Sequence, residues 1–311
     1  MNRKCQRGVA LVLVVWVATL LLAIAGSFLY STRTDAAAMR NSALLARAES
    51  IALGAVARAL LEVQKPAGLP GVWRRSPLPR EWLFEGATVR LTLLDESAKI
   101  DLNSANDALL LSLLRSTGMG PDESARVLDA ILDWRDADAF RRPNGAEERE
   151  YAEAGLSWRP ANQPFQTLEE VRLVLGLSPD AYRRIVPMST VHSRLPGINP
   201  HHAPRDVLLL LPNVTEELVD AYIGERDAAL QAGAQPPAFA AAGAYASYAP
   251  SSAVTVRAEV VLAEGIARTW EAVAIVTPQF ARRPYALLAW REATMPPRQG
   301  LPDEEGRSGA R

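Results

Sequence analysis

The sequence has few of the residues on which most enzymes and disulfide-braced exported proteins depend. Its 311 residues include one cysteine, Cys5, and three histidines. A single cysteine excludes an internal disulfide, so apolar cores must stabilise the folded regions. The G-x-S-x-G, phosphate-loop and H-E-x-x-H patterns of hydrolases, nucleotide-binding proteins and zinc proteases are also missing. We therefore expect no catalytic residue and no required cofactor.

Charge is absent from one long stretch near the N-terminus, residues 9–30. A run of about 20 apolar residues is long enough to cross a bilayer as a helix, which satisfies its own backbone polar groups. The leader of residues 1–8 is basic and ends in Arg7 and Gly8. Basic residues beside a membrane helix favour the cytoplasmic side. The sequence predicts a single transmembrane helix over 9–30, with the N-terminus in the cytoplasm and the main domain exported.

An amphipathic helix should extend the membrane helix over residues 31–65. Proline and glycine then become frequent, at Pro66 and Gly68, and end it. Apolar residues recur in it every three or four positions, which places them on one face: Leu44, Ala48, Ile51, Ala55, Ala59 and Val63.

Strand patterns occur on either side of a helical region. Residues 80–102 and 253–292 contain alternating, β-branched segments that predict the two parts of one antiparallel sheet. Between them, residues 103–230 contain repeated pairs of short helices around tight turns. Residues 231–252 are rich in alanine, proline, glycine and serine and indicate a mobile loop, and residues 293–311 indicate a disordered tail. We therefore predict an α+β fold: a long N-terminal helix packed on an antiparallel sheet, with a large inserted α-helical domain.

The helix pairs are of the helix-hairpin-helix or SAM-like type, which in some proteins binds DNA. Gly118-Met119-Gly120 matches the Gly-hydrophobic-Gly turn that presents amides to a phosphate. The other pairs do not match it, and residues 95–227 carry 14 basic and 23 acidic side chains, a net charge of −9. DNA affinity depends on clustered cations, so we expect no nucleic acid partner.

An acidic run follows one of these helices. Its carboxylates are of the kind that bind calcium, which takes six to eight oxygen ligands from a flexible loop. The spacing is not that of an EF-hand, and a solvated acidic loop with arginine counter-charges fits equally well. The candidate ligands, placed in a loop that ends a helix, are Asp133, Asp136, Asp138 and Glu147.

The junction between the leader and the apolar run resembles the type IV prepilin leader. The resemblance implies that an inner-membrane prepilin peptidase cuts after Gly8 and that the new N-terminal residue, Val9, is methylated. Most pilins carry a glutamate at the fifth mature position, where this chain has Leu13. In that family the glutamate is thought to pair with the N-terminal amine of the neighbouring subunit. A subunit without it could begin a filament but not extend one; an anchor-only homologue would also lack it.

Several motifs together resemble the type II secretion system protein K family of large minor pseudopilins. They are the Arg7-Gly8 leader, DESAKIDLNSA (Asp95–Ala105), DWRDAD (Asp133–Asp138) with Gly145-Ala146-Glu147, and INPHHAP (Ile198–Pro204). The resemblance implies an inner-membrane protein with a periplasmic domain at the tip of the pseudopilus, which primes assembly and supports export across the outer membrane. It implies contacts with minor pseudopilins I and J and with the major pseudopilin. Calcium is associated with the family, and its assignment to the four carboxylates is our inference.

Two other functions stay open from the residues alone. A DNA-uptake type IV pilus component would use the turn at Gly118–Gly120. A membrane-anchored periplasmic hydrolase would use the carboxylates, and would need a buried cleft around Asp133–Glu148.

Overall fold

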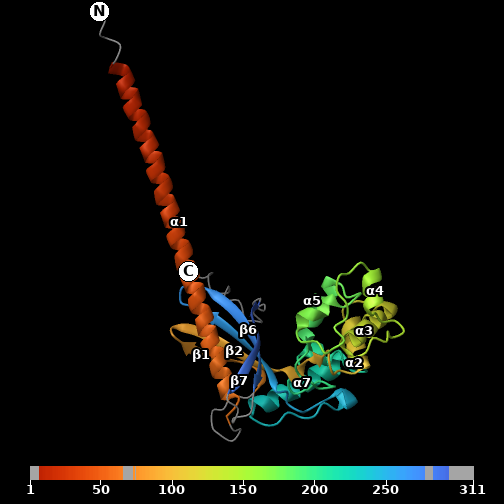
Figure 1. The fold of residues 1–311 in the computed structure, drawn as a ribbon. Helices are drawn as coiled ribbons and strands as arrows, with labels where there is room; N and C mark the ends of the chain where they lie inside the picture. Colours follow the sequence, from red (N-terminus) through yellow and green to blue (C-terminus); the bar gives the residue numbers. More distant parts are fainter. Residues whose placement is uncertain (1–6, 66–72, 74, 277–282, 294–311) are drawn as a thin grey trace, which may run out of the picture.

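The structure is a computed structural model that describes residues 7–65, 73, 75–276 and 283–293. A long helix, α1, runs beside a five-stranded antiparallel sheet, and a helical domain lies on the other side of that sheet (Figure 1). The predicted α+β fold, with its N-terminal helix, antiparallel sheet and helical domain, is confirmed.

Helix α1 (Arg7–Glu62) joins the predicted membrane helix and the amphipathic helix without a break. No proline occurs within it, so its backbone hydrogen bonds need not be interrupted. Its side chains are exposed from residue 10 to residue 43 and begin to be buried where α1 meets the sheet. Ala48, Ile51, Ala55 and Ala59, all on the predicted apolar stripe, are buried there.

The sheet has the strand order β1-β2-β5-β6-β7, and every neighbouring pair is antiparallel. Helix α1 contacts β2, β5 and β6. Side chains on these strands alternate between the two faces of the sheet, and those that face α1 form an apolar core with it. The strands span β1 (Ser76–Phe84), β2 (Ala87–Asp95), β5 (Ala253–Val261), β6 (Ala267–Val276) and β7 (Tyr285–Ala293).

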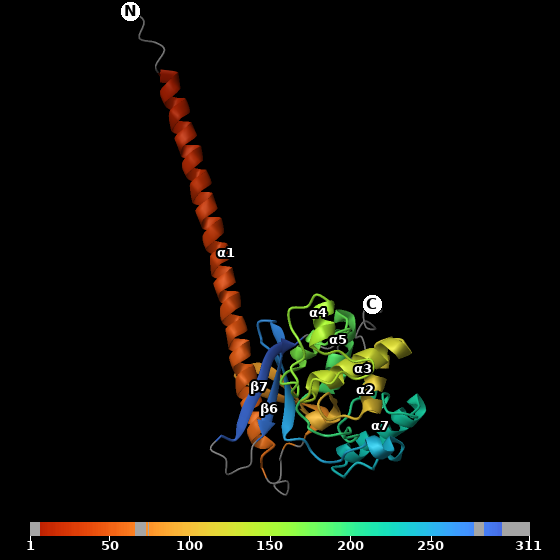
Figure 2. The same ribbon diagram turned by 45° about the vertical axis from the view of Figure 1, so that its right-hand side comes forward.

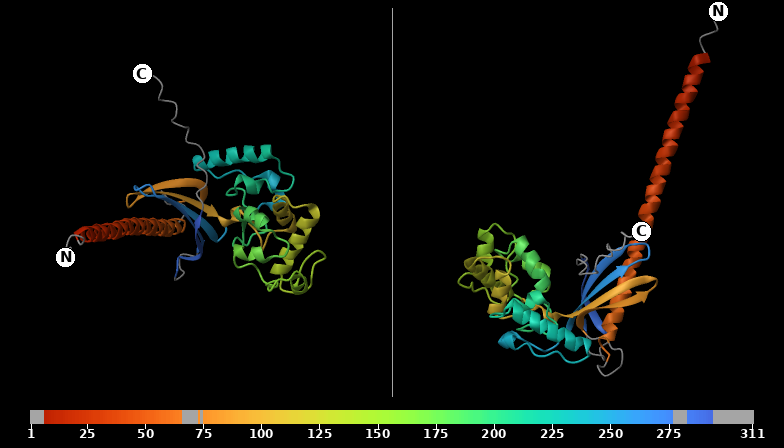
Figure 3. Two further views of the ribbon diagram at one scale, coloured as in Figure 1. Left: turned by 90° about the horizontal axis from the view of Figure 1, so that it is seen from above. Right: turned by 180° about the vertical axis from the view of Figure 1, so that it is seen from behind.

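The helical domain is inserted between two strands that lie side by side, β2 and β5. Arg47 on α1 donates a hydrogen bond to the carbonyl of Glu85, in the turn before β2, at 2.7 Å. Strand β2 therefore begins at the membrane-proximal end of the sheet and runs away from the N-terminal part of α1. The insertion leaves and re-enters the sheet at the far end, and two further views show the helical domain beside the sheet (Figures 2 and 3).

The helical domain repeats one unit three times, as the sequence predicts. Each unit is a pair of helices joined by a turn with one residue in the left-handed region: Gly118 (φ 92°), Gly176 (φ 85°) and Asn213 (φ 61°). In each unit this residue lies three positions before the second helix begins. Asparagine tolerates this conformation better than most residues, which explains the unit without a glycine. The pairs are α2 (Asp107–Arg115) with α3 (Pro121–Arg135), η2 (Leu168–Leu173) with α5 (Pro179–Ile185), and α6 (Arg205–Leu208) with α7 (Glu216–Gln231).

Shorter elements connect these units. Strands β3 (Ile100–Asp101) and β4 (Ser189–Thr190) form a small parallel pair. The remaining elements are η1 (Glu96–Ala98), α4 (Glu148–Glu153), η3 (Val186–Met188) and η4 (Ala240–Tyr245).

The segment 231–252 is more ordered than the predicted mobile loop. It contains η4, its side chains Phe239 and Ala242 are buried in the helical core, and Ile198 N donates to Tyr245 O at 2.9 Å. Apolar side chains at these two positions anchor the segment despite its loop-like composition. The leader residues 1–6 and most of the predicted tail, 294–311, lie outside the described residues.

Candidate functional site

The membrane segment of α1 is the first candidate region. Among the described residues, α1 is the one helix long and apolar enough to cross a membrane. Leu13 lies in this exposed apolar part, with 61% of its surface accessible. Gly8 and Val9 fall in the first turn of α1. Cleavage after Gly8, methylation of Val9 and the consequence of having leucine at position 13 remain predictions.

The four candidate calcium ligands lie at the two ends of one loop. Asp133 is in the last turn of α3, where its side chain is fully buried, and not in the loop as predicted from the sequence. Asp136 caps that helix at its C-terminus, Asp138 lies in the loop, and Glu147 is the N-cap residue of α4. The chain leaves α3 and returns to the start of α4, which brings the carboxylates together.

The loop backbone is held against the carboxylate of Asp133. The backbone N–H of Arg142 donates to both carboxylate oxygens, at 3.3 and 3.2 Å, and the Arg142 Nε lies 3.5 Å from Oδ1. A Cβ atom at Gly145 would lie 2.0 Å from Asp133 Oδ2. Only glycine leaves room for the loop to pass this carboxylate.

The cluster carries more buried negative charge than the protein neutralises. Burial raises the pKa of Asp133 to about 6, and the charge of Asp136 adds to this effect. Burial, followed by the charges of Asp133, Asp136 and Asp138, raises the pKa of Glu147 to about 7. Within the described part of the chain, Asp136 Oδ1 and Glu147 Oε1 are buried oxygens without a hydrogen-bond partner.

Such a cluster of unpartnered oxygens fits a hard cation such as calcium. In the residues that the structure describes, no three side chains of the metal-binding types already lie in a metal-binding arrangement. Water or backbone carbonyls would therefore have to complete the ligand set.

A pocket of about 550 Å³ lies beside this loop, but none of the four carboxylates lines it. Its walls come from α3, the loop and the turn near Gly176, and include Arg126, Arg141 and Asn144. The hydrolase alternative required the carboxylates to face a cleft, and this pocket gives that alternative no support.

The turn at Gly118–Gly120 has the backbone form of a helix-hairpin-helix, but a side chain of α5 covers it. That side chain is Arg184, whose Nη1 donates to Thr117 O at 2.7 Å. The same Nη1 would lie 3.8 Å from a Cβ atom added to Gly118. The turn joins α2 to α3 and is contacted by α5 of the next helix pair, and nothing else in its geometry supports the DNA alternative.

Sequence reasoning missed a buried carboxylate network where the helical domain joins the sheet. Glu96 accepts hydrogen bonds from Thr190, in the helical domain, and from Thr255, in β5. Lys99 Nζ lies 2.8 Å from its carboxylate. Burial alone would raise the pKa of Glu96, but Lys99 and the two threonines hold it below the usual value.

The preceding residue makes a second link of the same kind. Asp95 is fully buried and accepts from Ser97 N at 2.9 Å and Ser251 N at 3.0 Å, and Arg75 pairs with it. Asp95 is the last residue of β2 and the N-cap of η1, and Glu96 is the first residue of η1. Two consecutive acids at that place are the only signal in the sequence that could have indicated the network.

Residues 91–194 match the family model described as type II secretion system (T2SS), protein K. Among curated relatives, the type II secretion system protein K of Pectobacterium carotovorum is 28% identical over 60% of this chain and 62% of its own. That of Pseudomonas aeruginosa is 27% identical over 70% of this chain and 73% of its own. The chain thus spans less than two thirds of the length of the Pectobacterium relative.

A solved structure shares the fold. It is a chain of the GspK-GspI-GspJ complex from the enterotoxigenic Escherichia coli type 2 secretion system, which matches with a TM-score of 0.53 and 18% identity. The match covers 85% of this chain and 99% of that chain. The family model covers the DESAKIDLNSA motif (Asp95–Ala105) and the first two helix pairs. By family model, curated relatives and fold, the chain is similar to the type II secretion system protein K family.

Proposed function

We propose that the chain is a minor pseudopilin of a type II secretion system and that it occupies the tip of the periplasmic pseudopilus. The observation that carries this proposal is the combination of a membrane stem without a carboxylate at Leu13 and a bulky helical domain inserted between β2 and β5 that lies beside the sheet. Subunits inside a filament repeat at close spacing, so an extra domain fits best at an end. Docking below another subunit would require the missing acid, because a buried amine is costly without a partner.

In this proposal α1 anchors the chain in the inner membrane, with the N-terminus in the cytoplasm and the sheet and helical domain in the periplasm. Prepilin peptidase removes the leader after Gly8, and Val9 becomes the methylated N-terminus. The chain then assembles with minor pseudopilins I and J, primes the addition of the major pseudopilin, and supports protein export across the outer membrane. It acts as an assembly subunit rather than as an enzyme.

Mass spectrometry of the protein from the cells that produce it tests the first step. A chain that begins with methylated Val9 supports the proposal. A chain that still begins with Met1 contradicts it and leaves α1 as a simple anchor.

A charge substitution tests the tip position. Leu13→Glu supplies the acid that extending subunits use, whereas Leu13→Gln is of similar size and cannot ionise. If the missing acid restricts the subunit to the tip, immunogold labelling of filaments should show Leu13→Glu along their length and Leu13→Gln at their ends. Labelling restricted to the ends in both variants would remove this explanation of the tip position.

We also propose that the loop between α3 and α4 binds calcium through Asp133, Asp136, Asp138 and Glu147. The two buried, unpartnered oxygens of Asp136 and Glu147 support this assignment. Bound calcium would supply the positive charge that the cluster lacks and would fix the loop between the helices.

Thermal unfolding of the full chain in detergent measures this site without an activity assay. Calcium should raise the melting temperature, since a ligand that binds only the folded state stabilises it. Magnesium should have a much smaller effect, and Glu147→Gln should reduce the calcium shift. An equal shift in wild type and Glu147→Gln would remove Glu147 from the site.

A further inference from the structure

The two edges of the sheet differ in how they are protected. Strand β1 contains Pro77 and Pro79, which have no N–H group to donate, and it is irregular between Ser76 and Arg80. Proline and bulges are the devices that prevent an edge strand from pairing with another chain. Strand β7 (YALLAWREA) has no proline, and within the described residues it pairs only with β6. In the part of the chain that the structure describes, no strand pairs with its outer row of backbone groups.

Strand β7 also exposes apolar side chains. Leu287 and Leu288 have 44% and 40% of their surface accessible, and both lie in the half of the strand without charged residues. Helix α1 has an apolar residue on the adjacent side: Leu53, with 42% accessible, follows Glu49 by one turn. Apolar surface beside an open strand edge is typical of an interaction site.

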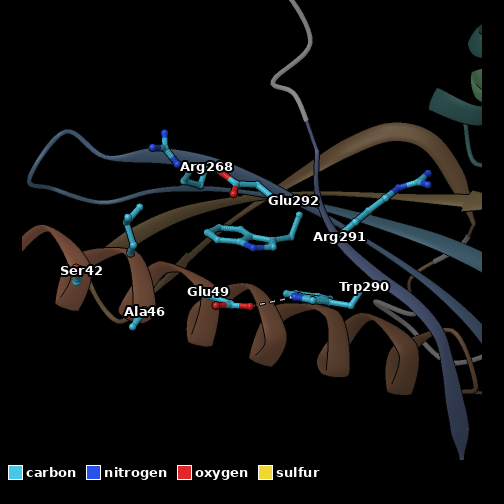
Figure 4. Close-up of a pocket in the computed structure, with 9 residues that line it drawn as sticks. Ser42, Ala46, Glu49, Arg268, Trp290, Arg291 and Glu292 are labelled. Atoms are coloured by element: carbon cyan, nitrogen blue, oxygen red, sulfur yellow. Dashed lines mark hydrogen bonds and ion pairs between the residues drawn. The ribbon is translucent and has the colours of Figure 1, made fainter. Parts of the chain in front are cut away.

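A groove of about 570 Å³ lies between α1 and β7 at this edge (Figure 4). Its apolar surface comes from Leu45, Trp270 and Trp290, and its α1 wall includes Glu49. Figure 4 shows Glu49 on the helix and Trp290 on the strand facing one another, with Trp290 Nε1 donating to Glu49 Oε1 at 3.1 Å.

The charges that line the groove leave one carboxylate without a cation. Arg268 pairs with Glu292 at 3.1 Å, and Arg291 pairs with Glu271. Among the described residues Glu49 makes no ion pair, and its hydrogen bond comes from a neutral indole. A cationic side chain beside Glu49 would gain the carboxylate and a contact with the half-buried ring of Trp290.

We infer that β7 is a docking edge for an extended segment of a partner pseudopilin. The segment adds to the sheet as a strand beside β7 and places a lysine or arginine in the groove next to Glu49. Main-chain hydrogen bonds along an edge supply affinity, and a pocket for alternate side chains supplies specificity. This inference rests on the proposed assembly with other minor pseudopilins and names the surface that the assembly uses.

Co-purification from membranes tests the inference. The full chain is produced together with minor pseudopilins I and J, and their recovery is compared for wild type, Leu287→Lys, Glu49→Lys and Leu83→Lys. Leu83 is 74% accessible on β1 and provides the same substitution on the opposite edge. We expect about tenfold less I and J with Leu287→Lys and with Glu49→Lys, and no change with Leu83→Lys.

Hydrogen exchange separates strand pairing from a contact through side chains alone. In the complex, the backbone amides of β7 that point away from β6 should exchange at least tenfold more slowly than in the free chain, while those at the outer edge of β1 should not change. Unchanged exchange at β7 would overturn the strand-pairing inference.

The remaining outcomes are also distinct. If wild type does not recover I or J, the proposed assembly fails and the inference fails with it. If wild type recovers them and both β7-side variants do so equally well, the assembly stands and β7 is not its surface. If the chain instead forms a dimer that Leu287→Lys dissolves, the edge pairs two copies and the heterologous partner is wrong.

Discussion

Single residues decide the geometry of the acidic loop. Gly145 lets the backbone approach Asp133, whose buried carboxylate holds the loop by accepting from Arg142 N. The sequence indicated the four carboxylates as a group, and the structure places them between the last turn of α3 and the start of α4. The sequence did not indicate that Asp133 is helical and buried, because the periodicity of its apolar residues does not locate the end of the helix between Asp133 and Asp136. The role of Gly145 also depends on a contact twelve residues away.

Gly145→Ala should destabilise the folded chain. The added methyl group would overlap Asp133 Oδ2, and overpacking of this kind costs about 1–3 kcal/mol. Chemical unfolding in detergent measures the loss, and Gly224→Ala, in the interior of α7 with open space at its Cβ, is the control. That control should be neutral or stabilising because alanine favours helix. Equal effects of the two changes would contradict the proposed contact.

The raised pKa values predict a pH dependence. Because Glu147 has a pKa of about 7 in the folded chain against a usual 4.5, the folded state holds its proton more tightly than the unfolded state. Without calcium, the free energy of unfolding should therefore fall as pH rises from about 4.5 to about 7. Asp133, with a pKa of about 6, acts in the same direction.

Thermal unfolding at pH 5 and pH 8 with a chelator measures this fall. Glu147→Gln should reduce it, while the histidines, common to both proteins, cancel in the comparison. Added calcium should oppose the fall in wild type more than in Glu147→Gln. A pH dependence that is identical in the two proteins would show that Glu147 is not the group responsible.

At the scale of elements, periodicity predicted most of the fold. The apolar stripe of α1, strands β2, β5, β6 and β7 and the helical repeat follow from spacing that local packing preserves. Strand β1 was not predicted, since its two prolines argue against a strand and are tolerated only because it lies at the sheet edge. The order within 231–252 depends on burial in a distant core and has no local pattern.

The helix-pair turns give a prediction at this scale. Gly118→Ala and Asn213→Ala should each destabilise the helical domain by about 1–2 kcal/mol, because alanine is strained in the left-handed conformation of both turns. Asn213→Gly should have little effect, since glycine adopts this conformation freely. Urea unfolding followed by circular dichroism measures all three. A loss with Asn213→Gly comparable to that with Asn213→Ala would indicate that the asparagine side chain, and not the backbone, is what the turn requires.

At the scale of the whole molecule, two separate apolar cores are joined through a buried polar junction. One core lies between α1 and the sheet and the other lies within the helical domain. Glu96 connects them by accepting from Thr190 on one side and Thr255 on the other. The motif that contains Glu96 contributed to the family resemblance, but its role as a link depends on two threonines far apart in the sequence.

Removal of this carboxylate should uncouple the two cores. Glu96→Ala leaves Lys99 and two threonines without their acceptor, and the loss of one partner of a buried ion pair costs about 3–5 kcal/mol. Calorimetry should then show the two cores melting at more widely separated temperatures than in wild type. Glu96→Gln, which retains an oxygen acceptor, should have an intermediate effect. Superimposable melting profiles for wild type and Glu96→Ala would contradict the link.

The unbroken course of α1 has a mechanical consequence. Its 56 residues, at 1.5 Å each, make a rod of about 84 Å that runs from the predicted membrane segment to the far end of the sheet. No proline interrupts it to absorb movement, and its last turns are packed into the sheet core. A displacement of the N-terminal end of α1 along its axis is therefore transmitted to the sheet.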